Sequence, residues 1–324
     1  MAVYTQLSAE TLSALIGEYD VGRLVSAKGI AEGVSNSNWI IETSGAGDHA
    51  RRFILTMYER RIDVGELPFF LGLLDHLSAK GLPVPRTIHD RDGAASRELG
   101  GKAVALIEFL PGVSVDHPTP AQARNVGAVL ARMHDAGRNF ERTRTDDLGP
   151  QVSARVLAEC GTAALADIDP ALPAMIAKAG TVADEWPADL PRSIIHSDLF
   201  PDNVLMLGDT VGGLIDFYFA CEDAMAYDLA VTHAAWSFSR QGREYRPEVG
   251  AALVEGYESV RVLSPPERSA MPLLCRGACM RFVSSRAQDW IETPAGAMVT
   301  RKDPMDFVRR FQTYERCGVE MFGA

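Results

Sequence analysis

The chain has 324 residues, 47% of them hydrophobic and 23% charged, which is an ordinary globular composition with enough length for two domains or lobes. The formal net charge of −11 gives no electrostatic support to a nucleic-acid-binding role, and any phosphate site must be assembled locally. No apolar run of about 18 residues and no basic-then-apolar leader occur, so we expect no membrane span and a cytoplasmic protein.

The first third of the chain alternates short strands with helices. Ser8 is a plausible helix N-cap, and Gly81 is a plausible helix end. The predicted elements in chain order are a helix at 8–18, strands at 24–31, 39–41 and 53–55, a helix at 66–80 and a strand at 104–109. Small polar residues fill the connection 33–38. By itself this pattern is typical of an ordinary hairpin loop. Small residues also let backbone N–H groups approach a phosphate closely.

The rest of the chain is mainly helical by its apolar spacing. Thr119 and Gln122 form a capping-box pattern with a proline between them at the first helical position. Predicted helices lie at 119–134 or slightly beyond, 152–166, 171–186, from about 227, 247–261, 266–290 and 304–317. The five cysteines include no C-x-x-C pair, so they are expected to be buried or partly buried thiols without a disulfide framework or zinc site.

The stretch from Ile194 to Asp216 carries the chemistry. Two apolar residues run into a polar loop with His196, Asp198 and Asn203, and an apolar strand follows. Gly208-Asp209 is a turn signal, after which a second strand delivers Asp216. A hairpin of this kind brings the oxygens of Asn203 and Asp216 toward one point.

Oxygen ligands of this type suit Mg²⁺, which needs only one or two protein carboxylates besides substrate phosphates. Asp198 is then placed to face a hydroxyl nucleophile. The pattern H-x-D-x-x-x-x-N followed by a strand-borne aspartate is the spacing used in kinase-type phosphoryl transfer, with ATP as the donor. The plain alternative is a loop and hairpin with an Asx turn, but the joint match of four positions favours the kinase interpretation.

At these residues the chain resembles the aminoglycoside-phosphotransferase-like kinases, and among them the bacterial homoserine kinases. Relatives that act on antibiotics or choline tend to carry glycine before the aspartate and a small residue before the asparagine, where this chain has Ser197 and Asp202. The continuation I-D-F-Y-F-A-C-E-D-A-M-A-Y-D-L-A, residues 215–230, also follows the homoserine-kinase variant. The resemblance extends from about Gly29 to about Asp289.

The resemblance implies an α+β, bilobal, protein-kinase-like fold. The expected N-lobe, residues 1–110, has a small antiparallel sheet and binds the nucleotide; the expected C-lobe, residues 111–324, is larger, mostly helical, and holds the catalytic loop, metal and substrate. A hinge at about 108–112 would read adenine around Glu108 and Leu110. The loop 33–38 would cover the phosphates, with contacts from Ser35, Asn36 and Ser37.

One position departs from the usual kinase pattern. Thr56 stands on the third strand where kinases carry a lysine for the α- and β-phosphates, although the L-T-x-Y pattern is similar to that of the homoserine kinases. Thr56 is therefore assigned to the ATP site. Arg60 and Arg61, just beyond, are candidate replacements for the lysine or simply solvated turn charges.

The implied reaction is transfer of a phosphoryl group from ATP to the side-chain hydroxyl of L-homoserine, giving O-phospho-L-homoserine for threonine biosynthesis. Asp202 and Asp223 are candidates for the substrate ammonium, Arg281 and Arg286 for its carboxylate, and Tyr218 for the site wall; each has an ordinary structural alternative. His196 and Asp228 are assigned structural support, and so is His134, which ends its helix.

Two other functions stay open from the sequence. One is a different small-molecule kinase of the same fold, acting on an aminoglycoside, choline or methylthioribose. The other is a non-catalytic, nucleotide-binding pseudokinase, for which the absent lysine is the only argument. Oligomeric state is not determined by the sequence.

Overall fold

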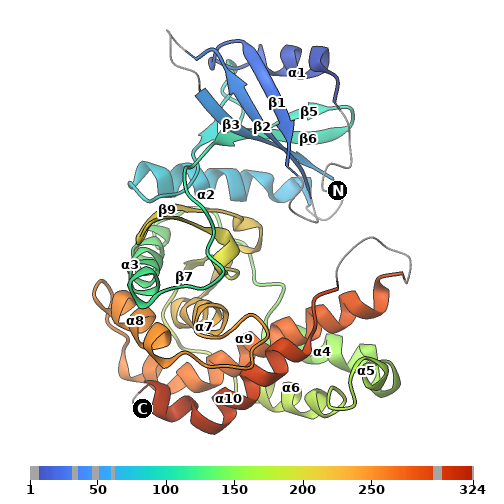
Figure 1. The fold of residues 1–324 in the computed structure, drawn as a ribbon, viewed down its shortest axis with the longest axis vertical. Helices are drawn as coiled ribbons and strands as arrows, with labels where there is room; N and C mark the ends of the chain where they lie inside the picture. Colours follow the sequence, from blue (N-terminus) through green and yellow to red (C-terminus); the bar gives the residue numbers. More distant parts are fainter. Residues whose placement is uncertain (1–6, 31–35, 46–50, 60–62, 295–300, 323–324) are drawn as a thin grey trace. The chain divides into compact units, whose positions relative to one another are not determined.

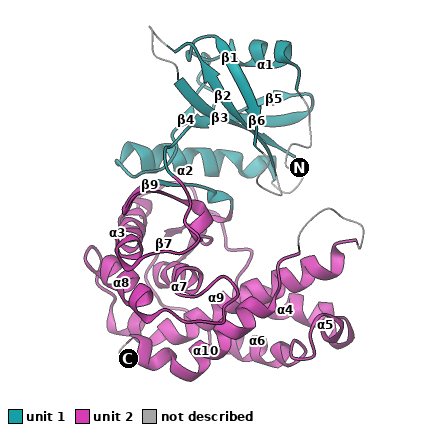
Figure 2. Ribbon diagram, in the orientation of Figure 1, with its two compact units in different colours: residues 1–112, 212–218 teal, residues 113–211, 219–324 magenta. Residues whose placement is uncertain are grey.

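The computed structural model describes residues 7–30, 36–45, 51–59, 63–294 and 301–322. The chain forms two compact units, coloured separately in Figure 2. Unit 1 comprises residues 1–112 and 212–218, and unit 2 comprises residues 113–211 and 219–324. The segment 212–218, which carries Asp216, thus groups with the N-terminal part of the chain.

Unit 1 is built on an antiparallel sheet (Figure 1). Its strands run in the order β1-β2-β3-β6-β4, and β5 also pairs with β6. The elements are α1 (Ala9–Ile16), β1 (Leu24–Gly29), β2 (Asn36–Thr43), β3 (Arg51–Tyr58), the 3-10 helix η1 (Val64–Glu66), α2 (Leu67–Ala79), β4 (Thr87–Ile88), β5 (Arg97–Leu99) and β6 (Lys102–Glu108). The expected helices and strands are all present, and Ser8 caps α1 by accepting from the Thr11 backbone N–H.

The two faces of this sheet follow from the period-two alternation of its strands. Trp39 and Ile41 of β2 and Leu55 of β3 share a core with α1. Tyr58 on the opposite face packs with residues of α2. One prediction here is wrong: residues 36–38 do not belong to a loop, because β2 begins at Asn36 and pairs it with Tyr58.

Unit 2 is mostly helical (Figure 1). Its elements are α3 (Pro120–Gly137), α4 (Pro150–Cys160), α5 (Thr162–Ile168), α6 (Ala174–Asp184), β7 (Arg192–Ile195), the 3-10 helix η2 (Pro201–Asn203), β8 (Val204–Leu207), β10 (Cys221–Ala224), α7 (Met225–Trp236), α8 (Pro247–Glu258), α9 (Pro265–Glu292) and α10 (Met305–Phe322). β7 and β10 pair antiparallel. The remaining elements, β9 (Thr210–Leu214) and the 3-10 helix η3 (Phe217–Phe219), each contribute residues to both units.

One expected helix differs from the structure, and another ends where it packs against a strand. The single helix predicted at 152–166 is broken into α4 and α5 at Gly161, whose φ of +76° is a left-handed conformation that suits glycine. The helix α3 continues through Gly137 to a C-cap at Arg138. A Cβ on Gly137 would lie 3.0 Å from Ser193 Oγ, so the glycine lets β7 pack closely against the helix end.

Helices α3 and α8 cross in backbone contact. A Cβ built on Gly256 of α8 would lie 1.9 Å from the Arg124 carbonyl oxygen of α3, and one on Gly127 of α3 would lie 2.1 Å from the Leu253 carbonyl oxygen. Only glycine permits this separation. The crossing matters for the site because Tyr257, next to Gly256, contacts His134 on α3.

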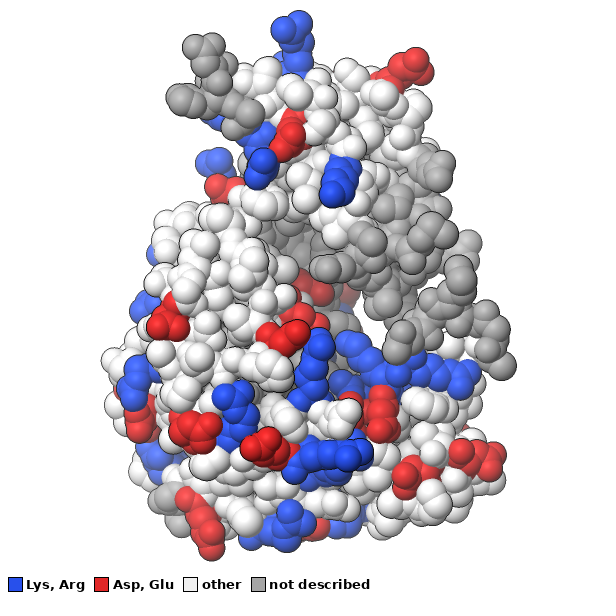
Figure 3. Space-filling model, in the orientation of Figure 1, with Lys and Arg blue, Asp and Glu red and all other residues white. Residues whose placement is uncertain are grey.

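Charged side chains of both signs lie on the surface, and the cysteines are not bridged. On the face drawn in Figure 3, basic and acidic side chains are interspersed over unit 2. Cys221, Cys275 and Cys279 are buried, Cys160 and Cys317 are partly buried, and all five are unbridged thiols. None of the helices among the described residues combines the length and the apolar character that crossing a membrane requires.

Candidate active site

The catalytic loop, which we define as residues 196–203, connects β7 to β8 and belongs wholly to unit 2. Its backbone is unusual at Ser197, where φ is +66°. A non-glycine residue in this region costs about 1 kcal/mol or more, and such strain clusters at functional sites. Other contacts must therefore hold Ser197 in this conformation.

Asp228 on α7 holds the loop through its backbone. The Asp228 carboxylate accepts the His196 N–H at 2.7 Å and the Ser197 N–H at 2.8 Å. Burial by itself raises the pKa of Asp228. The hydrogen bond from His134, the electrostatic influence of His134 and His196, and the His196 N–H together lower that pKa below its ordinary value. The side chain therefore stays ionised and supports the loop as a buried anion.

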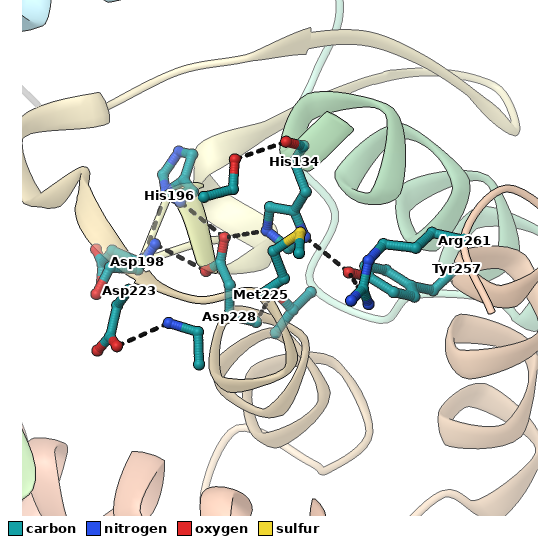
Figure 4. Close-up of polar contacts among 12 residues, drawn as sticks. His134, His196, Asp198, Asp223, Met225, Asp228, Tyr257 and Arg261 are labelled. Atoms are coloured by element: carbon teal, nitrogen blue, oxygen red, sulfur yellow. Dashed lines mark hydrogen bonds and ion pairs between the residues drawn. The ribbon is translucent and has the colours of Figure 1, made fainter. Parts of the chain in front are cut away.

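A polar relay runs from Asp228 through His134 and Tyr257 to Arg261 (Figure 4), and from there to Glu267 near the start of α9. His134 Nε2 donates to Asp228 Oδ2 at 2.9 Å, and its Nδ1 lies 2.8 Å from the Tyr257 hydroxyl. Arg261 donates to that hydroxyl at 3.3 Å and to Glu267 at 2.6 Å. Satisfied networks of this kind are rigid, because breaking one bond leaves a buried polar group unpaired.

Asn203 closes the loop on Asp198. Its Nδ2 donates to the Asp198 carbonyl oxygen at 2.8 Å and to the carboxylate Oδ2 at 3.2 Å. The amide nitrogen is thus used inside the loop, and the carbonyl Oδ1 is the atom of this side chain with the chemistry of a magnesium ligand. The Asp198 N–H also donates to His196 Nδ1 at 3.3 Å.

Arg281 on α9 lies against the same loop, and its side chain is buried. Its Nη1 donates to the carbonyl oxygen and, at 2.8 Å, to the hydroxyl of Ser197. Its Nη2 lies 3.9 Å from Asp198 Oδ1. The structure therefore brings together His196, Asp198, Asn203, Asp228 and Arg281 of the predicted site.

Other predicted substrate residues have different partners in unit 2. Asp223 pairs with Arg192 at 2.9 Å, and burial is the main reason its pKa is raised. Arg286 pairs with Asp306 at 3.1 Å, and burial lowers its pKa. Asp202 is exposed on η2. A role in binding homoserine stays a prediction for all three.

Asp216 and Tyr218 belong to unit 1. Asp216, like Ser197, has a left-handed backbone, with φ at +66°. Two residues later, the Tyr218 hydroxyl donates to the Tyr58 hydroxyl at 3.3 Å, and its ring packs edge-on against Tyr58 and Phe70. Tyr218 therefore anchors the segment that carries Asp216 to β3 and α2. A role of Tyr218 in binding the substrate stays a prediction, and the anchoring contacts are its ordinary structural alternative.

The predicted nucleotide residues also lie in unit 1. The Thr56 hydroxyl donates to Asn38 Oδ1 at 2.8 Å, on the sheet face that carries Tyr58. Asn36 Oδ1, on that same face, is buried and has no hydrogen-bond partner among the residues that the structure describes. Glu108 donates its backbone N–H to Arg86 at 2.9 Å, and Leu110 follows the end of β6. Ser35, Arg60 and Arg61 lie outside the described residues.

Ser37 has a different environment from that expected. It lies on the opposite face of β2, and its hydroxyl donates to Glu59 Oε1 at 2.7 Å. Glu59 also pairs with Lys102 at the start of β6. Sequence reasoning missed Glu59 and Lys102, as it missed Tyr257 and Arg261. The Glu59–Lys102 pair could have been predicted only from the strand register, which brings the end of β3 beside the start of β6.

The chain matches the phosphotransferase enzyme family over residues 26–263. Curated homoserine kinases are similar to it over nearly their whole length. The one from Granulibacter bethesdensis is 47% identical over 313 residues, which is 96% of each chain. The one from Gluconobacter oxydans is 48% identical over 318 residues, which is 97% of this chain and 98% of its own. The one from Rhizobium etli strain CFN 42 is 46% identical over 319 residues, which is 98% of this chain and 97% of its own.

Solved structures with the same fold are more distant in sequence. A spectinomycin phosphotransferase in complex with ADP and spectinomycin has a TM-score of 0.68 at 14% identity, covering 99% of both chains. Choline kinase from Cryptosporidium parvum has a TM-score of 0.66 at 12% identity, covering 98% of this chain and 97% of its own. These similarities establish the predicted α+β, protein-kinase-like fold.

Proposed function

The chain belongs to the phosphotransferase enzyme family, among its homoserine kinases, and we propose that it transfers the γ-phosphoryl group of ATP to the side-chain hydroxyl of L-homoserine. The observation that carries this proposal is the 46–48% identity to curated homoserine kinases over nearly the full length. The catalytic loop supports it, because Asp198 and Asn203 lie on one rigidly held segment.

Asp198 is the proposed catalytic residue. Its carboxylate orients the homoserine hydroxyl and accepts its proton while the hydroxyl oxygen forms a bond to the γ-phosphorus. The bond from that phosphorus to the bridging oxygen breaks, and the electron pair leaves with ADP. The protein's contribution to such a transfer is mainly positioning and electrostatics, which explains why so many contacts fix the loop.

Magnesium fits the donors present. Asn203 Oδ1 and the Asp216 carboxylate are the residues that we propose to hold it, because both are hard oxygen ligands. The metal, when bound with ATP, neutralises charge on the phosphate oxygens. Removal of divalent cations with EDTA should abolish turnover, and added Mg²⁺ should restore it.

The substrate is tested by measuring ADP release from ATP over a panel of hydroxyl compounds. L-homoserine should be turned over, whereas choline, methylthioribose and an aminoglycoside should give only background. Turnover of one of these other compounds in preference to homoserine would replace the proposed substrate, and the absence of turnover with every acceptor would favour a non-catalytic nucleotide-binding role.

The role of Asp198 is tested separately. Asp198→Ala should lower turnover with homoserine at least 100-fold, since a positioned base contributes roughly 10²–10⁴ in rate. Binding of a non-hydrolysable ATP analogue should stay within a few-fold of the wild type. Glu159→Gln, at an exposed position on α4, is the matched control and should leave both measurements unchanged.

A further inference from the structure

We propose that Arg281 is a positioning residue of the catalytic loop: its guanidinium fixes the peptide of Ser197 and places a positive charge beside Asp198. This role differs from the carboxylate-binding role that the sequence suggests for Arg281. The inference rests on the proposed phosphoryl transfer at Asp198, and it concerns how that side chain is held.

The first observation is that one nitrogen of Arg281 meets two acceptors on one residue. Nη1 donates to both the carbonyl oxygen and the hydroxyl of Ser197. The other end of Ser197, its N–H, is held by Asp228 at 2.8 Å. The residue directly before Asp198 is therefore fixed on both sides, by an anion from α7 and a cation from α9.

The second observation is the backbone of Ser197. Its φ of +66° is a conformation that favours glycine. In this conformation the buried carbonyl of Ser197 still needs a hydrogen-bond donor. Arg281 provides that partner, and the serine hydroxyl adds a second bond that glycine does not make. Ser197 and Arg281 thus form a pair in which the arginine stabilises a strained loop conformation.

The third observation is the burial of the guanidinium. Arg281 is 4% exposed. Its guanidinium carbon lies 4.9 Å from the centre of the Phe282 ring and 5.2 Å from that of Phe219. A cation buried among aromatic rings is retained where it has charged or polar partners. Here the partners are Ser197 and Asp198, so the positive charge is directed at the loop.

The two roles for Arg281 predict different kinetics. A carboxylate anchor acts only on a substrate that has a carboxylate. A positioning residue acts on Asp198 and therefore on every acceptor. The discriminating probe is 3-aminopropan-1-ol, which is homoserine without its carboxylate, assayed beside L-homoserine with Arg281→Met and Arg281→Lys.

We expect Arg281→Met to lower kcat about 10- to 100-fold for both acceptors by the same factor, with the KM for ATP nearly unchanged. Arg281→Lys, which keeps the charge and places its N–H donors on a single nitrogen, should recover part of the loss. Arg276→Met is the matched control, since Arg276 is half-buried on the same helix and about 140° away around its axis. It should leave kcat unchanged.

The proposal is overturned if Arg281→Met raises the KM for homoserine while kcat is kept and 3-aminopropan-1-ol is unaffected, because that pattern marks a substrate anchor. It is also overturned if kcat stays at the wild-type level for both acceptors. Should Arg281→Met fail to fold, the lysine variant carries the same comparison between the two acceptors. Wild-type turnover of homoserine tests the proposed function alone, so the two failures are distinguishable.

Discussion

Asp228 and His134 meet in the interior of unit 2, with 2.9 Å between Asp228 Oδ2 and His134 Nε2 and no exposure of either side chain. The same carboxylate accepts two N–H groups of the catalytic loop. One buried anion therefore joins α3, α7 and the loop.

Asp228→Asn should lower the free energy of unfolding by about 3 kcal/mol, because it leaves buried donors without their charged acceptor. It should also lower kcat, since the loop loses its support. Chemical denaturation and steady-state kinetics measure the two effects. A variant as stable and as active as the wild type would show that the relay has no such role.

The destabilisation caused by Asp228→Asn should depend on pH, because the pKa of Asp228 is lowered in the folded protein. A carboxylate with a lowered pKa contributes its stability above its ordinary pKa of 3.8, and loses it as pH falls through the lowered value. The difference in unfolding free energy between wild type and Asp228→Asn should therefore be constant above about pH 5 and shrink below about pH 4. A difference that grows on acidification would contradict the assignment.

His233, also fully buried in unit 2, should make the protein sensitive to mild acid. Burial lowers its pKa to about 3, so the folded protein keeps it neutral while the unfolded chain binds a proton below 6.5. Its contribution to stability is thus present above about pH 6.5 and declines by about 1.4 kcal/mol per pH unit as pH falls toward 3. His233→Gln should flatten the curve of unfolding free energy against pH over this range, and an unchanged slope would refute the prediction.

Two helix glycines should respond in opposite ways to substitution by alanine, because one lies at the crossing of α3 and α8 and the other has open space beside it. Gly256→Ala should lower the free energy of unfolding by about 2–3 kcal/mol, since its Cβ would meet the Arg124 carbonyl at 1.9 Å. Gly180→Ala on α6 has no atom within 4 Å of the new Cβ and should stabilise by about 0.5–1 kcal/mol. Thermal and urea unfolding of both variants test the comparison. Equal effects at the two positions would mean that the helices separate without cost.

The Tyr58–Tyr218 hydrogen bond predicts a coupled pair in unit 1. Tyr58 is buried, and burial raises its pKa to about 12. Tyr58→Phe and Tyr218→Phe should each cost about 1 kcal/mol of stability, because each leaves one hydroxyl without this partner. The double variant should cost less than the sum of the two, and strict additivity would contradict the coupling.

A kinetic consequence is expected for Tyr218→Phe as well. Tyr218 anchors the segment that carries Asp216, a proposed magnesium ligand. The variant should require a higher Mg²⁺ concentration for half-maximal turnover, with the KM for homoserine little changed. Tyr19→Phe, which removes another buried hydroxyl of unit 1, is the control and should keep the wild-type Mg²⁺ requirement.

The sequence alone predicted most helices and strands and placed the polar residues of the catalytic loop on one segment. Helix periodicity and caps located α1, α2 and α3, because these signals lie within a few residues of one another. The spacing of His196, Asp198 and Asn203 is likewise local, and one loop necessarily carries all three side chains. The same local reasoning failed at Asn36 and Gly161, where strand pairing and a left-handed glycine set the boundary.

The partners of these residues were decided only by tertiary structure. His134 and Asp228 are 94 residues apart in sequence, and Arg281 is 84 residues from Ser197. The residue types predicted chemical roles, but no periodic pattern connects positions so distant. The physical reason is that such contacts depend on how buried helix faces pack, as at the α3 and α8 crossing. The sequence could therefore offer Arg281 only as a candidate for the substrate carboxylate, and the fold alone shows that it lies against the catalytic loop.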